Sequence, residues 1–166
     1  MMHRKWLKVV AVPFLLLLGG MRTQTHVLSS PPSQPAEERA AQDRLPMSQS
    51  PLWAKFLECK VSYNNRNGIY SIAMTPDVKA IAGKTVSLNG FVLPLDGSDH
   101  TKHFLLTRRT PVCMFCPPGE PNEVAEIVTQ RSVVWTNKIV TVTGPLSLIN
   151  NGEKGMFFKI VADDVK

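Results

Sequence analysis

The sequence lacks the residue patterns of the common enzyme classes. It shows no Ser, His and Asp arrangement of a hydrolase, no glycine-rich phosphate loop and no pair of carboxylates placed for acid–base chemistry. No segment is repeated within the chain, which excludes a repeat architecture. Its 166 residues suffice for one domain with a hydrophobic core but not for two of ordinary size. These absences favour a single binding or structural domain over an enzyme.

Acidic residues are missing from the first 36 positions, which carry basic residues and a short apolar run instead. Arg4, Lys5 and Lys8 precede the run from Val9 to Leu18. This order is that of a secretory signal peptide, and the run is shorter than the about 20 apolar residues that span a bilayer. We predict that residues 1–25 are a signal peptide, or alternatively an uncleaved anchor that provides the only membrane attachment.

No Arg-Arg pair precedes the apolar run, so the general secretory route is favoured over the twin-arginine route. We therefore expect a periplasmic protein. The net charge of +6 includes four basic residues that lie before the first acid, Glu37, which leaves 15 basic and 13 acidic residues, a net charge near +2. That balance removes the electrostatic case for a DNA or RNA partner, and we expect no nucleic acid.

Apolar residues are scarce between the signal peptide and the following domain. Residues 26–51 are rich in Ser, Pro, Gln and charge, as in PPSQP and PMSQSP. Such a stretch buries too little apolar surface to offset the entropy lost on ordering. The stretch AEERAAQDR can form a helical turn or two but has no apolar face to dock. We predict a disordered tether over residues 26–51.

Apolar density rises at Leu52 and stays high, which predicts a folded domain over residues 52–166. Alternation of apolar and polar residues is typical of β-strands, and a kinked strand crosses Gly90. Thr75 followed by Pro76 predicts a short helix. The predicted fold is all-β, a small OB-like barrel of about five strands with one short helix, preceded by the tether. The predicted strands are 69–74, 84–96, 102–107, 122–129, 138–146 and 155–165, of which 122–129 also fits a helical stripe.

Several stretches between residues 80 and 163 resemble a known family. They are KTVSLNGFVLPL, FLLT, PVCMFCPPGEPNEV and IVTVTGPL. These stretches resemble the exported bacterial proteins of the domain of unknown function 3299 family. The resemblance implies an OB-like fold, a periplasmic or membrane-tethered location and a link to metal handling. It also implies a membrane transporter or another periplasmic protein as the partner, and it assigns no activity.

The chain has only three cysteines, Cys59, Cys113 and Cys116. In an oxidising compartment an odd number leaves at least one thiol free, bound to metal or paired with another chain. The spacing in Cys113-Met-Phe-Cys116 is shared by thiol redox proteins, zinc knuckles and copper carriers. His100 and His103 lie a short way upstream. The four residues make a candidate site for zinc or copper(I), although a regular strand would point the two imidazoles to opposite faces.

Two other interpretations of the cysteines are open. A thiol-disulfide enzyme would use Cys113 and Cys116, but Pro117 and Pro118 disfavour the helix N-terminus that lowers a thiolate pKa. Covalent c-type haem is excluded because Pro117 stands where the histidine belongs. In a structural module the pair forms a disulfide, within the loop or with Cys59. A bridge to Cys59 would close a loop of more than fifty residues, worth roughly 4 kcal/mol.

Pro117, Pro118, Asn122 and Glu123 form the candidate rim for a ligand or partner, because prolines make a loop stiff. The alternative is a rigid cover over one barrel end, with Glu123 merely solvated. No catalytic residue is assigned. The sequence thus predicts a periplasmic, non-enzymatic accessory or binding protein, with a possible transition-metal site at the cysteine loop.

Two further pairs of residues have simple structural interpretations. Trp53 and Trp135 are expected to be buried core aromatics rather than ligand-stacking groups. Arg108 and Arg109 are expected at an exposed strand end.

Overall fold

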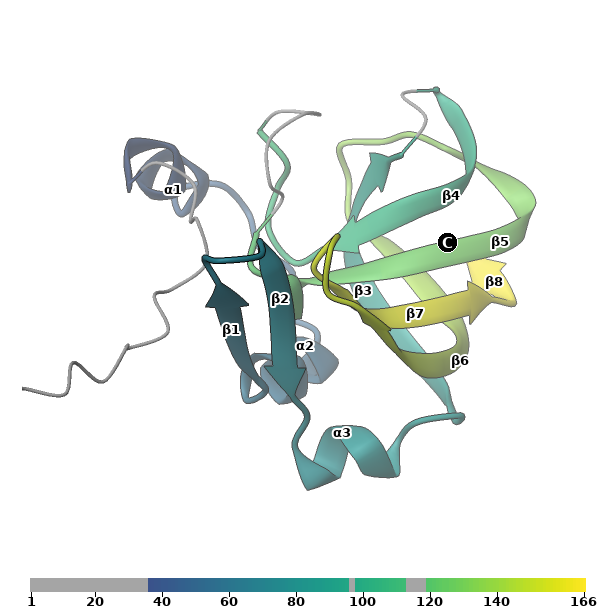
Figure 1. Ribbon diagram of the computed structural model, residues 1–166. Helices are drawn as coiled ribbons and strands as arrows, with labels where there is room; N and C mark the ends of the chain where they lie inside the picture. The colour runs from purple at the N-terminus through teal and green to yellow at the C-terminus, as the bar shows by residue number, and fades with distance from the viewer. Residues whose placement is uncertain (1–35, 96–97, 113–118) are drawn as a thin grey trace, which may run out of the picture.

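Five strands with alternating apolar residues close into a barrel (Figure 1). The computed structural model describes residues 36–95, 98–112 and 119–166. The strand order is β3-β4-β5-β7-β6, and β6 pairs with β3 to close the ring. Only β5 and β7 run parallel, and the other pairs are antiparallel. The predicted OB-like barrel is confirmed. Its strands are β3 (Thr85–Pro94), β4 (His100–Thr107), β5 (Val124–Val134), β6 (Val140–Asn151) and β7 (Met156–Ala162).

Gly90 is the point at which β3 passes from one neighbour to the other. Residues 85–90 pair with β6, whereas residues 91–94 pair with β4. A Cβ atom at Gly90 would lie 2.7 Å from the carbonyl oxygen of Thr107, so no larger residue fits there without a backbone shift. The predicted glycine kink is therefore the corner that lets one strand belong to both sides of the barrel.

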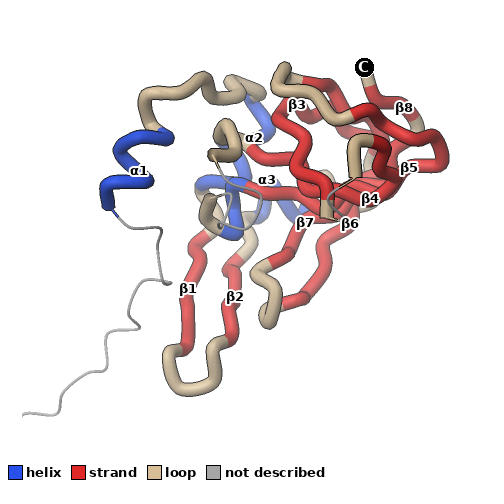
Figure 2. The backbone as a smooth tube through the Cα atoms, turned by 90° about the horizontal axis from the view of Figure 1, so that it is seen from above, coloured by secondary structure: helices blue, strands red, loops and turns tan. Residues whose placement is uncertain are grey.

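A two-stranded hairpin stands beside the barrel (Figure 2). It consists of β1 (Lys60–Asn64) and β2 (Ile69–Ala73). It is followed by the predicted short helix, α3 (Pro76–Ala80), whose N-cap Thr75 accepts a hydrogen bond from the Val78 N–H. A two-residue strand, β8 (Asp164–Val165), pairs with β6 at the C-terminus.

Helix α2 (Pro51–Leu57) contributes two large aromatic residues to the barrel core. Trp53 and Phe56 are three positions apart and therefore share one helix face, and both are buried. The Phe56 ring stacks on Phe158 of β7, with ring centres 3.9 Å apart. The burial expected for Trp53 is confirmed. One short helix was predicted, and α2 is an addition, because seven residues give too little periodicity to identify a helix.

The sequence between residues 36 and 50 differs from the predicted tether. Residues 36–42 form helix α1 (Ala36–Gln42), and the Met47 backbone bridges to Arg109. Gln42 and Ser48 are fully buried, and the Ser48 hydroxyl donates to the Asn89 carbonyl at 2.6 Å. The segment docks through polar groups rather than an apolar face, which is why composition did not predict its order. The remainder of the predicted tether and residues 1–25 lie outside the described residues.

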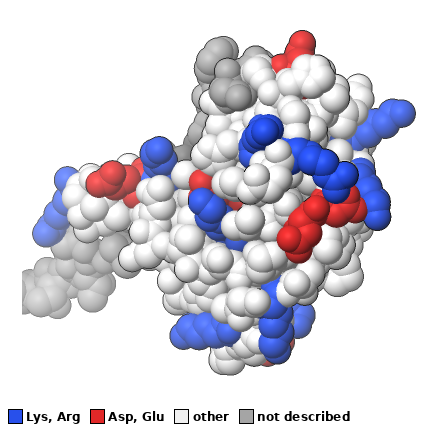
Figure 3. Space-filling model, turned by 90° about the vertical axis from the view of Figure 1, so that its right-hand side faces the viewer, with Lys and Arg blue, Asp and Glu red and all other residues white. Residues whose placement is uncertain are grey.

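Charges of both signs are interspersed on the face shown in Figure 3. Ion pairs on the surface include Arg131 with Asp164 at 3.7 Å and Lys166 with Asp164 at 2.9 Å. Within the described ranges, no helix combines the length and apolar character needed to cross a membrane.

Candidate functional site

The cysteine loop is framed by two described segments that converge on the same part of the barrel. Cys113, Cys116, Pro117 and Pro118 lie outside the described residues, so their predicted roles rest on sequence alone. The chain enters the loop through residues 108–112, at the end of β4, and leaves it through residues 119–123. The geometry of these two segments defines what the loop is attached to.

The entering segment is held by the N-terminal region. The Ser48 N–H donates to the Arg108 carbonyl at 2.9 Å, beside the bridge between Met47 and Arg109. Gln42 Nε2 donates to the Thr110 carbonyl at 2.9 Å. The Thr110 hydroxyl in turn donates to the Pro46 carbonyl at 2.7 Å. The backbone just before the cysteines therefore has both side-chain and main-chain anchors.

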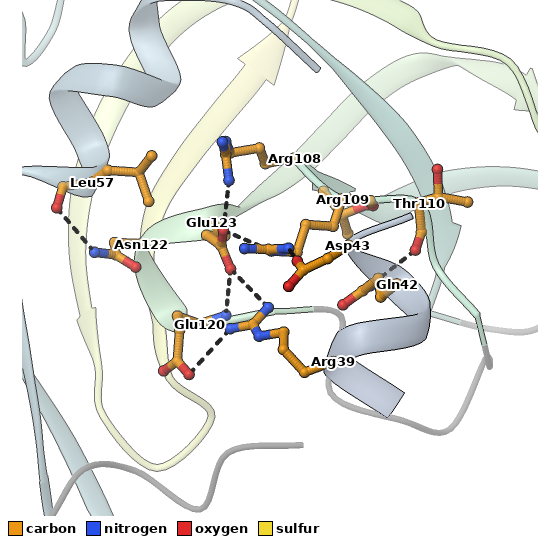
Figure 4. Close-up of polar contacts among 11 residues, drawn as sticks. Arg39, Gln42, Asp43, Leu57, Arg108, Arg109, Thr110, Glu120, Asn122 and Glu123 are labelled. Carbon is orange, nitrogen blue, oxygen red and sulfur yellow. Dashed lines mark hydrogen bonds and ion pairs between the residues drawn. The ribbon is translucent and has the colours of Figure 1, made fainter. Parts of the chain in front are cut away.

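The leaving segment forms a short 3-10 helix, η1 (Pro121–Glu123), whose last residue is the centre of an ion-pair cluster (Figure 4). Glu123 Oε1 accepts hydrogen bonds from Arg108 Nη1 and Arg109 Nε, each at 2.8 Å. Glu123 Oε2 accepts one from Arg39 Nη1 at 3.3 Å and one from the Glu120 N–H at 3.2 Å. One carboxylate thus joins α1, the entering segment and the leaving segment. We call Arg39, Arg108, Arg109 and Glu123 the arginine cluster.

The protonation of Glu123 follows from these contacts. Burial alone would raise its pKa, but the Glu120 N–H and the guanidinium groups of Arg109 and Arg39 together lower the pKa below 4.5. Glu120 behaves oppositely: burial and the Glu123 charge raise its pKa, against the opposing effect of Arg39 and Arg109. Asp43 supplies a further acidic partner through an ion pair with Arg109. Three carboxylates, those of Glu123, Glu120 and Asp43, thus lie against the three guanidinium groups of the arginine cluster.

This cluster changes the interpretation of several predicted residues. Glu123 is 2% exposed, so it is neither solvated nor open to a ligand. Arg108 and Arg109, expected at an exposed strand end, are mostly covered because both guanidinium groups turn toward Glu123. Asn122 Nδ2 donates to the Cys59 carbonyl at 3.1 Å and ties η1 to the end of α2. Both described members of the predicted rim are thus bound by the chain itself.

Cys59 is a free thiol in the hydrophobic core. It is 2% exposed, and its Sγ lies 3.9 Å from the Lys55 carbonyl oxygen. The predicted alternative of a disulfide to Cys59 is therefore not formed in this structure. Cys59 is thus the one cysteine among the described residues, and its thiol is free and buried.

The two predicted histidine ligands lie on β4. His103 Nε2 lies 2.7 Å from Oε1 of the buried Glu126, which Lys159 Nζ also approaches at 3.5 Å. His100 lies at the start of β4, opposite Val134, and a register shift separates it from His103. The described residues contain no group of three or more His, Cys, Asp or Glu placed to hold a metal ion.

A pocket of about 320 Å³ opens beside the entering segment. Its lining includes Phe91 and Leu93 of β3 together with Val112 and Trp135. Trp135, expected in the core, is 49% exposed and follows the end of β5, where its main-chain N–H donates to the Asp99 carbonyl at 2.8 Å. Val112, the residue before Cys113, is also exposed.

A family model described as a protein of unknown function (DUF3299) matches residues 31–157. The chain belongs to the DUF3299 family. The match confirms the resemblance seen in the sequence and includes α1, which the sequence analysis had assigned to the tether. A crystal structure of a DUF3299 family protein from Pseudomonas aeruginosa PAO1 is similar to this chain at 18% identity, with a TM-score of 0.48, covering 81% of this chain and 82% of that chain. No curated protein matches.

The arginine cluster of this DUF3299 protein was missed by the sequence analysis. Its members Arg39 and Glu123 are 84 positions apart, and no local pattern relates them. The one signal was the pair Arg108 and Arg109 at a strand end, followed by the stiff exit Pro-Asn-Glu. Chemically, the arrangement fixes both ends of a short cysteine- and proline-containing segment, which suits presentation of that segment to a bound species.

Proposed function

We propose that this DUF3299 protein is a periplasmic, non-enzymatic accessory protein that binds a transition metal ion, zinc or copper(I), through Cys113 and Cys116. The observation that carries the proposal is the attachment of both loop ends to Glu123. Arg108 and Arg109 reach this carboxylate from before the cysteines, and Glu120 reaches it from after them. Fixing the ends of a loop reduces the entropy that its side chains lose when they bind.

The state of Cys59 also supports a paired role for the other two cysteines. Because Cys59 is buried in the core, it is not available to pair with either of them without unpacking the barrel. Two thiolates separated by two residues are suited to soft and borderline metals such as copper(I) and zinc. Pro117 and Pro118 disfavour the helical setting of a thiol-disulfide enzyme, so we favour metal binding over redox exchange.

The thiolates are the ligands on which the proposal rests. His103 would have to exchange its 2.7 Å contact with Glu126 to use Nε2 as a ligand. We therefore expect the histidines to be dispensable for binding the metal ion. The partner that receives or supplies the metal is proposed to be a membrane transporter or another periplasmic protein, following the family resemblance.

The first test is the metal content of protein purified under reducing conditions. We expect about one zinc or copper(I) per chain by elemental analysis. The variants Cys113→Ser and Cys116→Ser should lose the metal, because a single thiolate gives a much weaker site. Thiol alkylation on the same sample should label Cys113 and Cys116 only after the metal is removed.

Cys59→Ser is the matched control and should keep the metal, since that thiol is buried in the core. His103→Ala should keep it as well. A disulfide between Cys113 and Cys116 in metal-free protein freshly isolated from cells would contradict the proposal. Loss of metal in Cys59→Ser but not in Cys113→Ser would contradict it too.

The second test concerns export. The basic and then apolar N-terminus predicts a processed protein in the periplasmic fraction, shortened by a segment that ends between about Gly20 and His26. Intact-mass measurement of that fraction gives the cleavage position. A full-length chain found only in the cytosol would refute export, whereas a full-length chain in the inner membrane would identify an uncleaved anchor.

A further inference from the structure

The pocket beside the entering segment has the size and lining of a small-molecule site. Its volume of about 320 Å³ lies at the lower end of the range of small-molecule pockets, about 300–1,000 Å³. Phe91, Leu93, Val112 and Trp135 supply apolar surface from three separate segments. Pockets that hold small molecules are concave, mainly apolar and carry a few polar groups that orient the ligand. This pocket meets those conditions.

The polar groups of the pocket carry no formal charge. Thr136 supplies a hydroxyl and Asn137 an amide, and both follow directly after Trp135. Among the described residues, no lysine, arginine, histidine, aspartate or glutamate lines the pocket. A charged ligand would lose its hydration there without gaining a partner of opposite charge. The electrostatics therefore select an uncharged ligand.

Trp135 determines which kind of apolar ligand fits. Its side chain is half exposed, although indole rings usually bury most of their surface when nothing else requires their exposure. The main-chain N–H of Trp135 donates to the Asp99 carbonyl, which holds the backbone of Trp135 at the barrel end. A flat ring stacked on the indole would cover its exposed face and displace water from the apolar lining.

We propose that this pocket binds a small, uncharged aromatic molecule that stacks on Trp135 and directs a hydrogen-bonding edge toward Thr136 and Asn137. An aromatic side chain of a partner protein has the same ring chemistry. The Thr136 hydroxyl and the Asn137 amide favour a free molecule with a polar edge, because a phenylalanine ring would offer them no hydrogen bond. This proposal is independent of the metal at the cysteine loop.

The test is calorimetric titration of the purified mature protein, reduced and metal-free, with indole as the probe. We expect a dissociation constant between about 10 µM and 1 mM, the range open to a two-ring fragment. Indole-3-acetate and tryptamine, which add a negative or a positive charge to the same ring, should bind at least about tenfold more weakly. Trp135→Ala should also weaken indole binding at least about tenfold.

Two variants test whether a loss of indole binding reflects a loss of folding. Val161→Ala removes an exposed apolar side chain on β7, outside the pocket, and should bind indole as the parent does. Asn137→Ala, at an exposed position, should weaken indole binding while the circular dichroism spectrum stays unchanged.

Four results would overturn the proposal. The first is the absence of any heat of binding up to about 5 mM indole, and the second is equal affinity for indole and its charged analogues. The third is an unchanged affinity for indole in Trp135→Ala, and the fourth is tighter binding of N-acetyl-tryptophanamide than of indole. The last result would assign the pocket to a peptide-borne ring. Because the metal is absent from the sample, none of these results depends on whether the cysteine loop binds metal.

Discussion

Replacing Glu123 with glutamine is expected to lower the free energy of unfolding by about 3 kcal/mol. Removing one partner of a buried ion pair typically costs ~3–5 kcal/mol, because the remaining charge stays buried without compensation. Here three guanidinium groups lose the same carboxylate. We expect the low end of this energy range, because the three arginine side chains remain 15–24% exposed. Urea unfolding monitored by circular dichroism measures the change.

Asp43→Asn is the matched control, because Asp43 also pairs with an arginine of the cluster. Among the described residues Asp43 forms an ion pair only with Arg109, and its side chain is half exposed, so its loss should cost at most about 1 kcal/mol. Equal effects of Glu123→Gln and Asp43→Asn would show that the arginine cluster is not organised around Glu123.

The contribution of Glu123 to the free energy of unfolding should also depend on pH in a defined direction. Since the folded-state pKa of Glu123 lies below 4.5, its stabilising contribution is complete above about pH 4.5 and disappears as the pH falls through the folded pKa. The stability difference between the parent and Glu123→Gln should therefore shrink in acid. Glu120 has a raised pKa, so its ionised form costs stability at neutral pH and protonation relieves that cost. Glu120→Gln should accordingly show the opposite trend with pH.

Replacing Phe56 with alanine is expected to cost about 3–5 kcal/mol of unfolding free energy. Phe56 is fully buried, stacks on Phe158 and meets Trp53 edge-to-face at a ring distance of 5.7 Å. The substitution removes the buried ring surface and leaves a cavity between α2 and β7 that rigid strands cannot fill.

Leu57→Ala is the control for Phe56, because it is the next residue of the same helix and is 39% exposed. We expect a change of less than about 1 kcal/mol there. If both variants lost the same stability, α2 would contribute through its helix alone and not through its contact with the barrel.

The barrel was predictable because its signals are local. Alternation along β3, β6 and β7, a glycine at the corner of β3, and the Thr75 cap before Pro76 all act within a few residues. The candidate site was only partly predictable. The cysteine spacing was evident, whereas the contacts of Glu123 with Arg39 and of His103 with Glu126 join distant segments.

Helix α1 shows why the rest escaped sequence reasoning. Its stretch has no apolar stripe, and composition therefore assigned it to a disordered tether. In the structure Arg39 reaches Glu123 and Gln42 reaches the Thr110 carbonyl, so docking depends on charge and amide groups with specific partners. The energy of a polar contact depends on where its partner lies in the fold, and a periodic sequence pattern gives no information on that position.

The stacking of Phe56 on Phe158 has a consequence for how the chain reaches its native state. Phe56 belongs to the first packed helix of the barrel, whereas Phe158 belongs to its last long strand. A chain that emerges from its N-terminus therefore lacks the stacking partner of Phe56 until β7 has appeared. Contacts of such long sequence separation slow folding and leave apolar surface open to aggregation. The late arrival of β7 thus places the stage most open to aggregation just before the barrel closes.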